Sequence, residues 1–259
     1  MYSFDYVKPG SIDEAVAALQ AEDAQALGGG QTLIPTLRQR LAQPSVLVDL
    51  GGCLDAGVAS QDGGCRIGGG ATHASVAASA DAPKWLRAVA DGIGDPQVRN
   101  RGTIGGSLAN NDPASDYPAA VLGSGAEIST NARTIAADDY FQGMFETALN
   151  EGEIITGVTF PKLEAANYQK FDQPASRFAL VGVFVGKGAG GVRVAVTGAS
   201  ESGVHRWADA EAALAGNFST DAVPGAPSAD GVISDLHGSA EYRAHLVAVL
   251  TRRAVAAAG

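Results

Sequence analysis

Two glycine-rich stretches point most directly to chemistry. Residues 26–35 read ALGGGQTLIP, and residues 99–116 read RNRGTIGGSLANNDPASD. Glycine adopts backbone angles that turn successive N–H groups into one concave nest, which binds an anion without a lysine. Neither Gly28–Thr32 nor Gly102–Ser107 contains a lysine. Two such nests could hold the two anionic groups of a diphosphate from both sides, so we expect both loops to serve one ligand.

The two loops do not match the common nucleotide-binding motifs. A Walker loop requires Gly-Lys-Ser/Thr, which is absent from both stretches. The Gly-x-Gly-x-x-Gly pattern fails because Leu33 stands where its last glycine would be needed. The ligand is therefore not assigned from these motifs.

The elements around the loops can be read from capping residues and apolar spacing. Ser11 and Glu14 form a capping box that begins a helix. The first loop is expected between a strand over residues 24–27 and a helix from about Pro35, with Leu33, Leu37 and Leu41 on one face. Further patterns predict strands at residues 45–50, 153–160, 178–185 and 192–197, and helices at 72–80, 83–93, 115–122, 207–214 and 240–257.

The order of these elements predicts two domains of an α+β protein. Strands and helices interleave over the first two-thirds of the chain, whereas a glycine-linked hairpin and two helices follow residue 172. We place the domains at residues 1–174 and 175–259. Residues 216–237 are rich in Gly, Ser, Pro and Asp, and we expect a mobile surface segment there.

Composition excludes several classes of protein. The chain has 259 residues, 46% of them hydrophobic, and a net charge of −10, which argues against a nucleic-acid surface. No apolar run reaches the roughly 18 residues that span a bilayer, and the N-terminus does not read as a secretory signal. We expect a cytoplasmic protein without a transmembrane segment, and peripheral association with the inner face of the membrane stays open.

Cysteine and histidine usage gives no metal site. Cys53 and Cys65 are the only cysteines, and an iron–sulfur cluster typically needs about four. The four histidines are scattered, and His73 in Ala-Thr-His-Ala is most simply read as the start of a helix. We assign no metal ligand and no catalytic residue.

Beyond these features, the sequence is identified as a member of a known family. AQALGGGQTLIPTLRQRLAQPSVLVDL and DPQVRNRGTIGGSLANNDPASDYPAAVL resemble the two FAD loops of the FAD-binding medium subunit of molybdenum hydroxylases, the group of carbon monoxide dehydrogenase and xanthine dehydrogenase. GEIITGVTFP and YQKFDQPASRFALVGVF are similar to the segments around the isoalloxazine ring, and SAEYRAHLVAVLTRRAV to the closing helix. The resemblance covers nearly the whole chain.

This resemblance implies a fold and a role. The fold is a two-lobed FAD-binding domain of the vanillyl-alcohol-oxidase/PCMH type, followed by a smaller C-terminal domain of antiparallel strands and helices. The role is electron transfer: FAD accepts electrons from [2Fe-2S] clusters of a small partner subunit and passes them to an external acceptor. Molybdopterin belongs to a large partner subunit, and the expected assembly is a dimer of heterotrimers.

The resemblance also implies the cofactor-binding residues. In the first loop these are Leu27, Gly28, Gly29, Gly30, Gln31, Thr32, Leu33 and Ile34, and in the second Thr103, Ile104, Gly105 and Gly106. Asp116 is expected near a sugar hydroxyl of the nucleotide, and Ile93 and Ile155 near the ring system. Gln31 occupies the position where some flavoproteins carry a covalent histidine link, so we expect non-covalent FAD.

One position departs from the family pattern. Relatives often have a lysine or arginine after the phenylalanine of the segment matched by Lys170-Phe171, and this chain has Asp172. A cation there would stabilise the reduced flavin anion. Either Lys170 or a backbone donor replaces it, or the flavin potential is lower.

Two other functions stay open on the sequence alone. The first is a self-contained FAD-dependent reductase or oxidase of the same fold superfamily, which would need an acid or base over the flavin. The second is a docking subunit that has lost FAD, against which the intact glycine loops argue. The substrate of the complex and the electron acceptor are not encoded in this chain.

Overall fold

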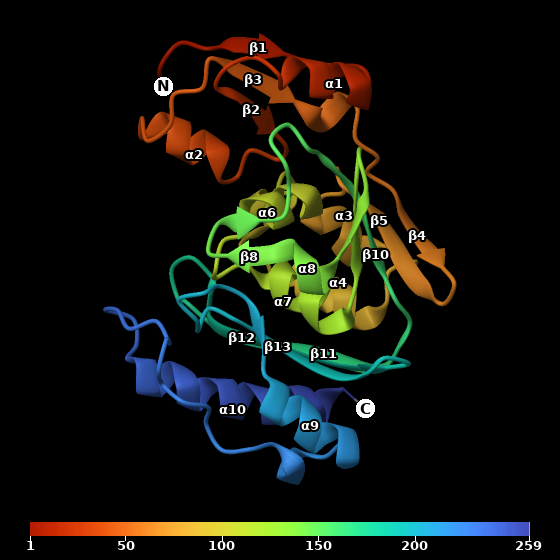
Figure 1. Cartoon of the computed structure of the whole chain (residues 1–259), viewed down its shortest axis with the longest axis vertical. Helices are drawn as coiled ribbons and strands as arrows, with labels where there is room; N and C mark the ends of the chain where they lie inside the picture. The colour runs from red at the N-terminus through yellow and green to blue at the C-terminus, as the bar shows by residue number, and fades with distance from the viewer. Residues whose placement is uncertain (259) are drawn as a thin grey trace.

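The chain folds into three parts stacked along its longest axis (Figure 1). The structure, a computed structural model, describes residues 1–258. The N-terminal part is a parallel sheet in the order β1-β3-β2 with two helices beside it. Its elements are β1 (Asp5–Val7), α1 (Ile12–Ala18), β2 (Ala24–Leu27), α2 (Leu33–Arg38), β3 (Val46–Asp49) and the 3-10 turn η1 (Leu50–Gly52).

The middle part is built on an antiparallel sheet in the order β4-β5-β10-β6-β7. Its strands are β4 (Val58–Gln61), β5 (Gly64–Gly68), β6 (Glu127–Thr130), β7 (Thr134–Ala136) and β10 (Ile155–Phe160). A hairpin of β8 (Phe141–Gly143) and β9 (Glu146–Thr147) lies beside them. The helices are α3 (His73–Ala78), α4 (Lys84–Asp91), α5 (Pro96–Arg99), α6 (Ile104–Asn110), α7 (Asp116–Ser124) and α8 (Ala137–Tyr140).

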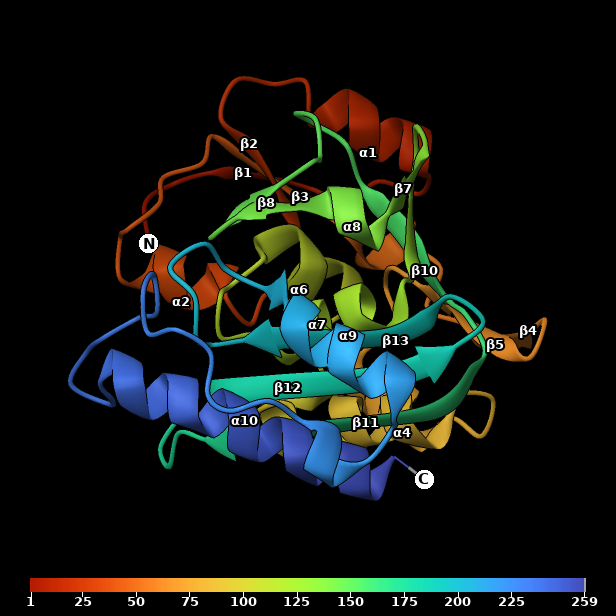
Figure 2. The ribbon, with the colours of Figure 1, turned by 60° about the horizontal axis from the view of Figure 1, so that its bottom comes forward.

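The C-terminal part is a second antiparallel sheet with helices on its outer face. The strands run in the order β11 (Leu163–Asp172), β12 (Ala179–Gly188), β13 (Gly191–Thr197) and β14 (His205–Arg206). The sheet lies between α7 on one side and α9 (Ala208–Gly216) and α10 (Ala240–Ala257) on the other, as Figures 1 and 2 show. The short 3-10 turn η2 (Thr220–Ala222) connects the two outer helices.

Strand β12 contributes to two cores because its side chains alternate between two covered faces. Phe184 joins the core of the middle part, where its ring packs edge-on against Trp85 at a centroid distance of 5.1 Å. Val183 and Val185 face the other way and pack with residues of α10 such as Leu250. Since both faces are buried, β12 reads as a continuous apolar run rather than an alternating one.

Most predicted elements are confirmed. The α+β class holds, β2 and α10 have the expected bounds, and β12 and β13 form the expected hairpin. Ser11 accepts a hydrogen bond from a backbone amide at the start of its helix, as its capping pattern predicted, and Thr72 and Ser239 do the same for α3 and α10. None of the helices within residues 1–258 is long and apolar enough to cross a membrane.

Several local expectations were wrong in detail. Helix α2 begins at Leu33 and already ends at Arg38, so Leu41 lies beyond it and is 74% exposed instead of sharing its apolar face. Glu14 accepts from the amide of Gly10 rather than from that of the cap residue Ser11. Ser115 precedes α7 without capping it, because its Oγ is 2.9 Å from Ser107 Oγ. Only the difference at Ser115 involves another element, since Ser107 lies on α6.

Of residues 216–237, which were expected to be mobile, Gly216 ends α9 and the rest is irregular apart from η2, yet Val223 is buried and Arg252 donates to the carbonyls of Val223 and Pro224. Strand β11 pairs with β12 along its whole length, so the second sheet already begins at Leu163. The boundary at residues 174 and 175 stays a prediction.

Candidate functional site

The first glycine loop presents a run of free backbone amides. It connects β2 to α2, and within residues 1–258 no protein atom accepts a hydrogen bond from the amides of residues 28–32. Gly30 is buried and has φ +75°, a conformation that glycine adopts without strain. Buried or half-buried amides are nearly always paired in folded proteins. Of these residues, Gly28, Gly29 and Gly30 are buried or half-buried, and an acceptor with several oxygens, such as a diphosphate, would satisfy their amides.

The second glycine loop is organised differently. Thr103 caps α6, and its Oγ1 accepts from the amide of Gly106 at 3.1 Å. The amides of Ile104 and Gly105 donate to the carbonyls of Ala71 and Gly69, each at 3.0 Å. These three amides are therefore already used within the protein, so they are not the nest expected from the sequence. The glycines here allow close packing, since a Cβ on Gly105 would lie 2.6 Å from the Gly69 oxygen.

The two loops nevertheless meet at one place. A Cβ on Gly29 would lie 1.9 Å from the carbonyl oxygen of Arg101 and 2.7 Å from the Cα of Gly102. A Cβ on Gly28 would lie 3.2 Å from Thr103 Oγ1. The backbones thus approach as closely as glycine permits, and the free amides of the first loop lie next to the capped start of α6. The structure brings together the two stretches that the sequence singled out.

A buried histidine supports the second loop from behind. The His73 amide donates to the Gly102 carbonyl at 2.9 Å, and Thr72 and Thr103 form an isolated β-bridge. The His73 ring is 4% exposed, and its Nε2 would lie 2.6 Å from a Cβ on Gly102. Burial lowers the pKa of His73 to about 4, so the imidazole is neutral at physiological pH. Its role is to fix the loop, in agreement with its predicted place at a helix start.

Asp116 lies in a buried polar cluster instead of facing an open site. It is 4% exposed and accepts from the Tyr168 hydroxyl at 2.7 Å and from Lys170 Nζ at 3.1 and 3.2 Å. Burial raises the pKa of Asp116, while the Lys170 ammonium and the Tyr168 hydroxyl act in the opposite direction. Its carboxylate is thus already bound by protein groups, and a sugar contact would have to share them.

Lys170 connects three segments of the chain. Besides Asp116 it donates to the carbonyls of Gly92 and Arg177, both at 2.8 Å, and lies 3.3 Å from Asp172. The Lys170 side chain is 9% exposed, whereas that of Asp172 is 57% exposed. Lys170 is therefore not free to replace the lysine or arginine that was expected at the position of Asp172, because its charge is shared between the carboxylates of Asp116 and Asp172.

The remaining residues predicted to bind FAD lie beside the first loop, behind the second loop or just after α4. Leu27 and Ile34 flank Gly30, whose Cβ would lie 2.6 Å from Ile34 Cδ1 and 3.4 Å from Leu27 Cδ1. Ile155 is 4% exposed and its carbonyl packs against Gly69, behind the second loop. Ile93 is half-buried two residues after the end of α4. Its neighbour Gly92 accepts a hydrogen bond from Lys170. Gln31, Thr32 and Leu33 complete the turn into α2, with Gln31 and Thr32 exposed.

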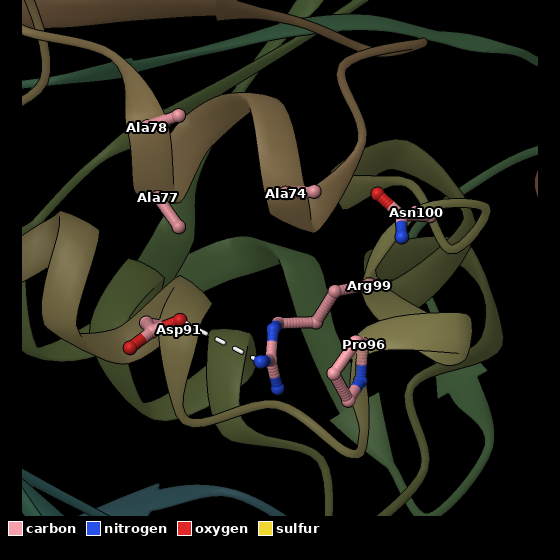
Figure 3. A pocket seen from close by; sticks show the side chains of 7 residues that line it. All are labelled: Ala74, Ala77, Ala78, Asp91, Pro96, Arg99 and Asn100. Atoms are coloured by element: carbon pink, nitrogen blue, oxygen red, sulfur yellow. Dashed lines mark ion pairs between the residues drawn. The ribbon is translucent and has the colours of Figure 1, made fainter.

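A shallow hollow lies behind α5, on the chain that leads into the second loop (Figure 3). Three alanines of α3 form one wall, and Arg99 and Asp91 lie opposite them. Arg99 donates to the carbonyls of Ile93 and Gly94, each at 3.1 Å, and its guanidinium is 3.7 Å from Asp91. Arg99 thus forms an ion pair with Asp91 and holds the turn between α4 and α5.

Tyr168 and His73 were missed as supporting residues. Tyr168 is 52 residues from Asp116 in sequence, so no local pattern connects the two. His73 follows a glycine run, yet its ring reaches the second loop, 29 residues further along the chain, only because α3 and α5 pack together. Within residues 1–258, no group of His, Cys, Asp and Glu side chains could hold a metal ion.

Comparisons with known proteins find relatives over nearly the whole chain. Residues 2–163 match the family described as the FAD binding domain in molybdopterin dehydrogenase. The chain is 38% identical to the nicotine 6-hydroxylase medium subunit of Paenarthrobacter nicotinovorans, over 98% of this chain and 96% of that one. It is 35% identical to the carbon monoxide dehydrogenase medium chain of Afipia carboxidovorans, with the same coverage.

Solved structures give the same result. Carbon monoxide dehydrogenase from Hydrogenophaga pseudoflava, in a form lacking the Mo-pyranopterin moiety, is similar with a TM-score of 0.88 and 32% identity, over 99% of this chain and 97% of that one. Quinoline 2-oxidoreductase from Pseudomonas putida 86 is similar with a TM-score of 0.87 and 28% identity, at the same coverage. The likeness extends through the C-terminal part, beyond the segment matched by the family.

Proposed function

Because this chain belongs to the family of FAD-binding domains in molybdopterin dehydrogenases, we propose that it is the electron-transfer subunit of a molybdenum hydroxylase complex. It is an oxidoreductase component whose cofactor is FAD. In the proposed role it accepts electrons from [2Fe-2S] clusters of a small partner subunit and passes them to an external acceptor. A large partner subunit carries molybdopterin and oxidises the substrate.

The observation that carries this proposal is the run of free amides in the first loop, held against the second loop. Residues 28–32 would bind the diphosphate of non-covalent FAD through these amides, and Thr32 adds an exposed hydroxyl. Leu27, Leu33 and Ile34 would cover the adjacent part of the nucleotide. Bound FAD would supply a centre that can take up electrons one at a time, as [2Fe-2S] clusters deliver them, and release them singly or as a pair.

The site offers little for chemistry on a substrate of its own. The His73 imidazole is buried behind the second loop, and Tyr168 is buried and bonded to Asp116, with its pKa raised well above the ordinary value by burial. Neither group is placed to exchange protons with a substrate in an open cleft. This favours a subunit that relays electrons over a self-contained reductase or oxidase.

The proposal extends to assembly and location. The relatives named above are medium subunits and medium chains, which supports a chain that works with partner subunits. We propose a dimer of heterotrimers in the cytoplasm, with peripheral contact to the inner face of the membrane as the alternative.

The proposal is tested by expressing the chain alone and together with the neighbouring genes. Alone, it should carry flavin that absorbs near ~450 nm and contain no iron or molybdenum by elemental analysis. Carbon monoxide, aldehydes and N-heterocycles should leave that flavin oxidised, and one of them should bleach it once the partner subunits are present. Reduction of the flavin by a substrate in the isolated chain would overturn the subunit role.

A further inference from the structure

The N-terminal part, residues 1–52, has a core of its own and is joined to the rest of the protein by one segment of chain. Its core contains Ala15, Leu19, Val48 and Leu50, and among the described residues Ile154 is the one buried side chain that another part contributes to it. The chain crosses to the middle part after η1, on the side where α1 lies and opposite α2 (Figure 1). The N-terminal part is therefore built to move as one body about that crossing.

The seam between residues 1–52 and residues 55–258 has no polar fastening in the described chain, since neither a hydrogen bond nor an ion pair crosses it. The polar contacts of the N-terminal part stay inside it, as in the hydrogen bonds from Tyr6 to Asp49 and from Ser45 to the Glu22 carbonyl. Its sheet likewise pairs β1 and β2 with β3 alone. The N-terminal part is thus held by packing and by its single chain connection.

The middle and C-terminal parts are joined in a different way. The Gly198 amide donates to the Pro113 carbonyl at 2.7 Å, and Arg193 Nε donates to the Leu122 carbonyl at 3.1 Å. The ion pair of Lys170 with Asp116 crosses the same boundary. These two parts form one body, and the contrast singles out the N-terminal part as the one that can move.

The crossing itself is anchored at both ends. On the N-terminal side, the Leu54 amide still donates to the Leu50 carbonyl at 3.2 Å. On the other side, the Asp55 carbonyl accepts from the Gly70 amide at 2.8 Å, and the Asp55 carboxylate lies 3.0 Å from Arg66 Nη1. The hinge is thereby confined to the link between Leu54 and Asp55, and such short links at the ends of elements absorb the rotation in hinge motions.

The glycine loops meet across this seam. Gly28 and Gly29 approach residues 101–103 by backbone contact alone, and the amides of residues 28–32 are free of protein acceptors within the described chain. The diphosphate of FAD is expected on these amides, whereas the segments expected around its ring, residues 152–161 and 168–184, lie on the other side of the seam. One FAD molecule would therefore contact both bodies.

We propose that the N-terminal part is a hinged clamp that bound FAD closes onto the middle part. The proposal rests on the proposed function, because FAD is the group that spans the seam. Without FAD, the clamp rotates as a rigid body about the link between Leu54 and Asp55. A ligand shifts such an equilibrium when it binds one form more tightly than the other. FAD favours the closed form because only that form offers it the amides of residues 28–32 and the ring segments together.

The test measures the distance between two spin labels by pulsed electron paramagnetic resonance on the full chain. Labels on Arg38→Cys and Lys84→Cys span the seam, because Arg38 lies exposed on α2 and Lys84 lies exposed on α4. Cys53→Ser removes the partly exposed natural thiol, and Cys65 is buried. The distance distribution should become about twofold narrower when FAD is restored to the flavin-free chain.

Two controls isolate the clamp. Labels on Lys84→Cys and Asp209→Cys lie on the two parts that hydrogen bonds join, since Asp209 lies exposed on α9, and their distribution should be the same with and without FAD. ADP has the diphosphate but lacks the flavin ring, so it reaches only one side of the seam. Saturating ADP should leave the distribution of the first pair broad.

Hydrogen exchange distinguishes a moving body from an unfolding one. The amides of the central strand β3 should stay protected in the flavin-free chain, because a rigid clamp keeps its own sheet. Loss of that protection, narrowing by ADP alone, or a distribution of equal width with and without FAD would each overturn the proposal. A chain that binds FAD with an unchanged distribution sinks the clamp alone, whereas a chain that never binds FAD sinks the proposed function and the clamp with it.

Discussion

Gly29 faces the carbonyl oxygen of Arg101 so closely that a Cβ at this position would lie 1.9 Å from it. We predict that Gly29→Ala separates the two glycine loops, lowers the free energy of unfolding by about 1–3 kcal/mol, and abolishes FAD binding. Flavin content and urea unfolding measure both effects. Gly190→Ala is the control, since nothing lies within 4 Å of its would-be Cβ. Unchanged flavin content in Gly29→Ala would contradict the shared site.

Because the amides of residues 28–32 are free, we expect most of the affinity for FAD to come from its diphosphate. Hydrogen bonds to a charged acceptor contribute about 1.5–3 kcal/mol each, so losing two of them should weaken binding roughly 100-fold. Riboflavin, which lacks the diphosphate, should therefore bind the flavin-free chain at least about 100-fold more weakly than FAD. Fluorescence titration measures both affinities, and ADP should compete with FAD. Equal affinity for riboflavin would place the main contacts on the ring instead.

The buried ion pair of Lys170 with Asp116 predicts a large loss of stability when one partner is removed. Lys170→Met should cost about 3–5 kcal/mol, because the Asp116 carboxylate stays buried without its cation. Lys187→Met removes an exposed pair with Glu164 and should cost less than about 1 kcal/mol. Urea unfolding of the two variants gives the comparison. Similar losses in both would mean that Asp116 becomes protonated and tolerates its isolation.

We expect the protein to lose stability in acid when the Glu153 carboxylate becomes protonated. Hydrogen bonds from Arg133, and further ones from the Asn150 amide and Thr130, lower the pKa of Glu153 from 4.5 to about 2. A carboxyl whose folded pKa is depressed contributes stability above its unfolded pKa, and this contribution is lost as pH falls from about 4.5 towards 2. We expect about 2 kcal/mol from this residue after allowing for screening.

The test variant for this prediction is Glu153→Gln. Its control is Glu151→Gln, because Glu151 lies exposed in the same turn. The first should be less stable than the wild type at pH 7, and the difference should disappear near pH 2. The second should follow the wild type throughout. A constant difference across the pH range would show that Glu153 acts through packing and not through its charge.

The position of Asp172 predicts an effect on the flavin potential. Unit charges about 6 Å apart at an effective dielectric of ~20 interact by roughly 3 kcal/mol, which solvent reduces to about 1 kcal/mol. Since about 30 mV corresponds to 1.4 kcal/mol for a two-electron couple, Asp172→Lys should raise the potential by some tens of millivolts. A spectroscopic redox titration measures it, with Asp209→Lys on α9 as the remote control. An unchanged potential would place Asp172 away from the flavin.

The sequence predicts elements that depend on consecutive residues, but it does not predict contacts between segments that are far apart in the chain. Ser239 and the apolar spacing after it predict α10, because a cap and a buried stripe are properties of consecutive residues. The meeting of Gly29 with Arg101 followed only from the expectation of one shared ligand. The amides of Ile104 and Gly105 were expected to be free, but the loop at Gly69 and Ala71 accepts from them. Nothing near those residues in sequence indicates that partner.

The cluster around Asp116 has a consequence for how such subunits can be recombined. Asp116 lies inside the segment matched by the FAD-binding family, which ends at residue 163, whereas Tyr168 and Lys170 lie on β11 beyond it. A flavin module cut at that point would keep both glycine loops but would remove the two donors of the Asp116 carboxylate, together with the strands β12 and β13 that pack against α7. A chimaera that exchanges C-terminal halves between relatives would therefore have to carry Tyr168 and Lys170 with the flavin module, or exchange all three residues together.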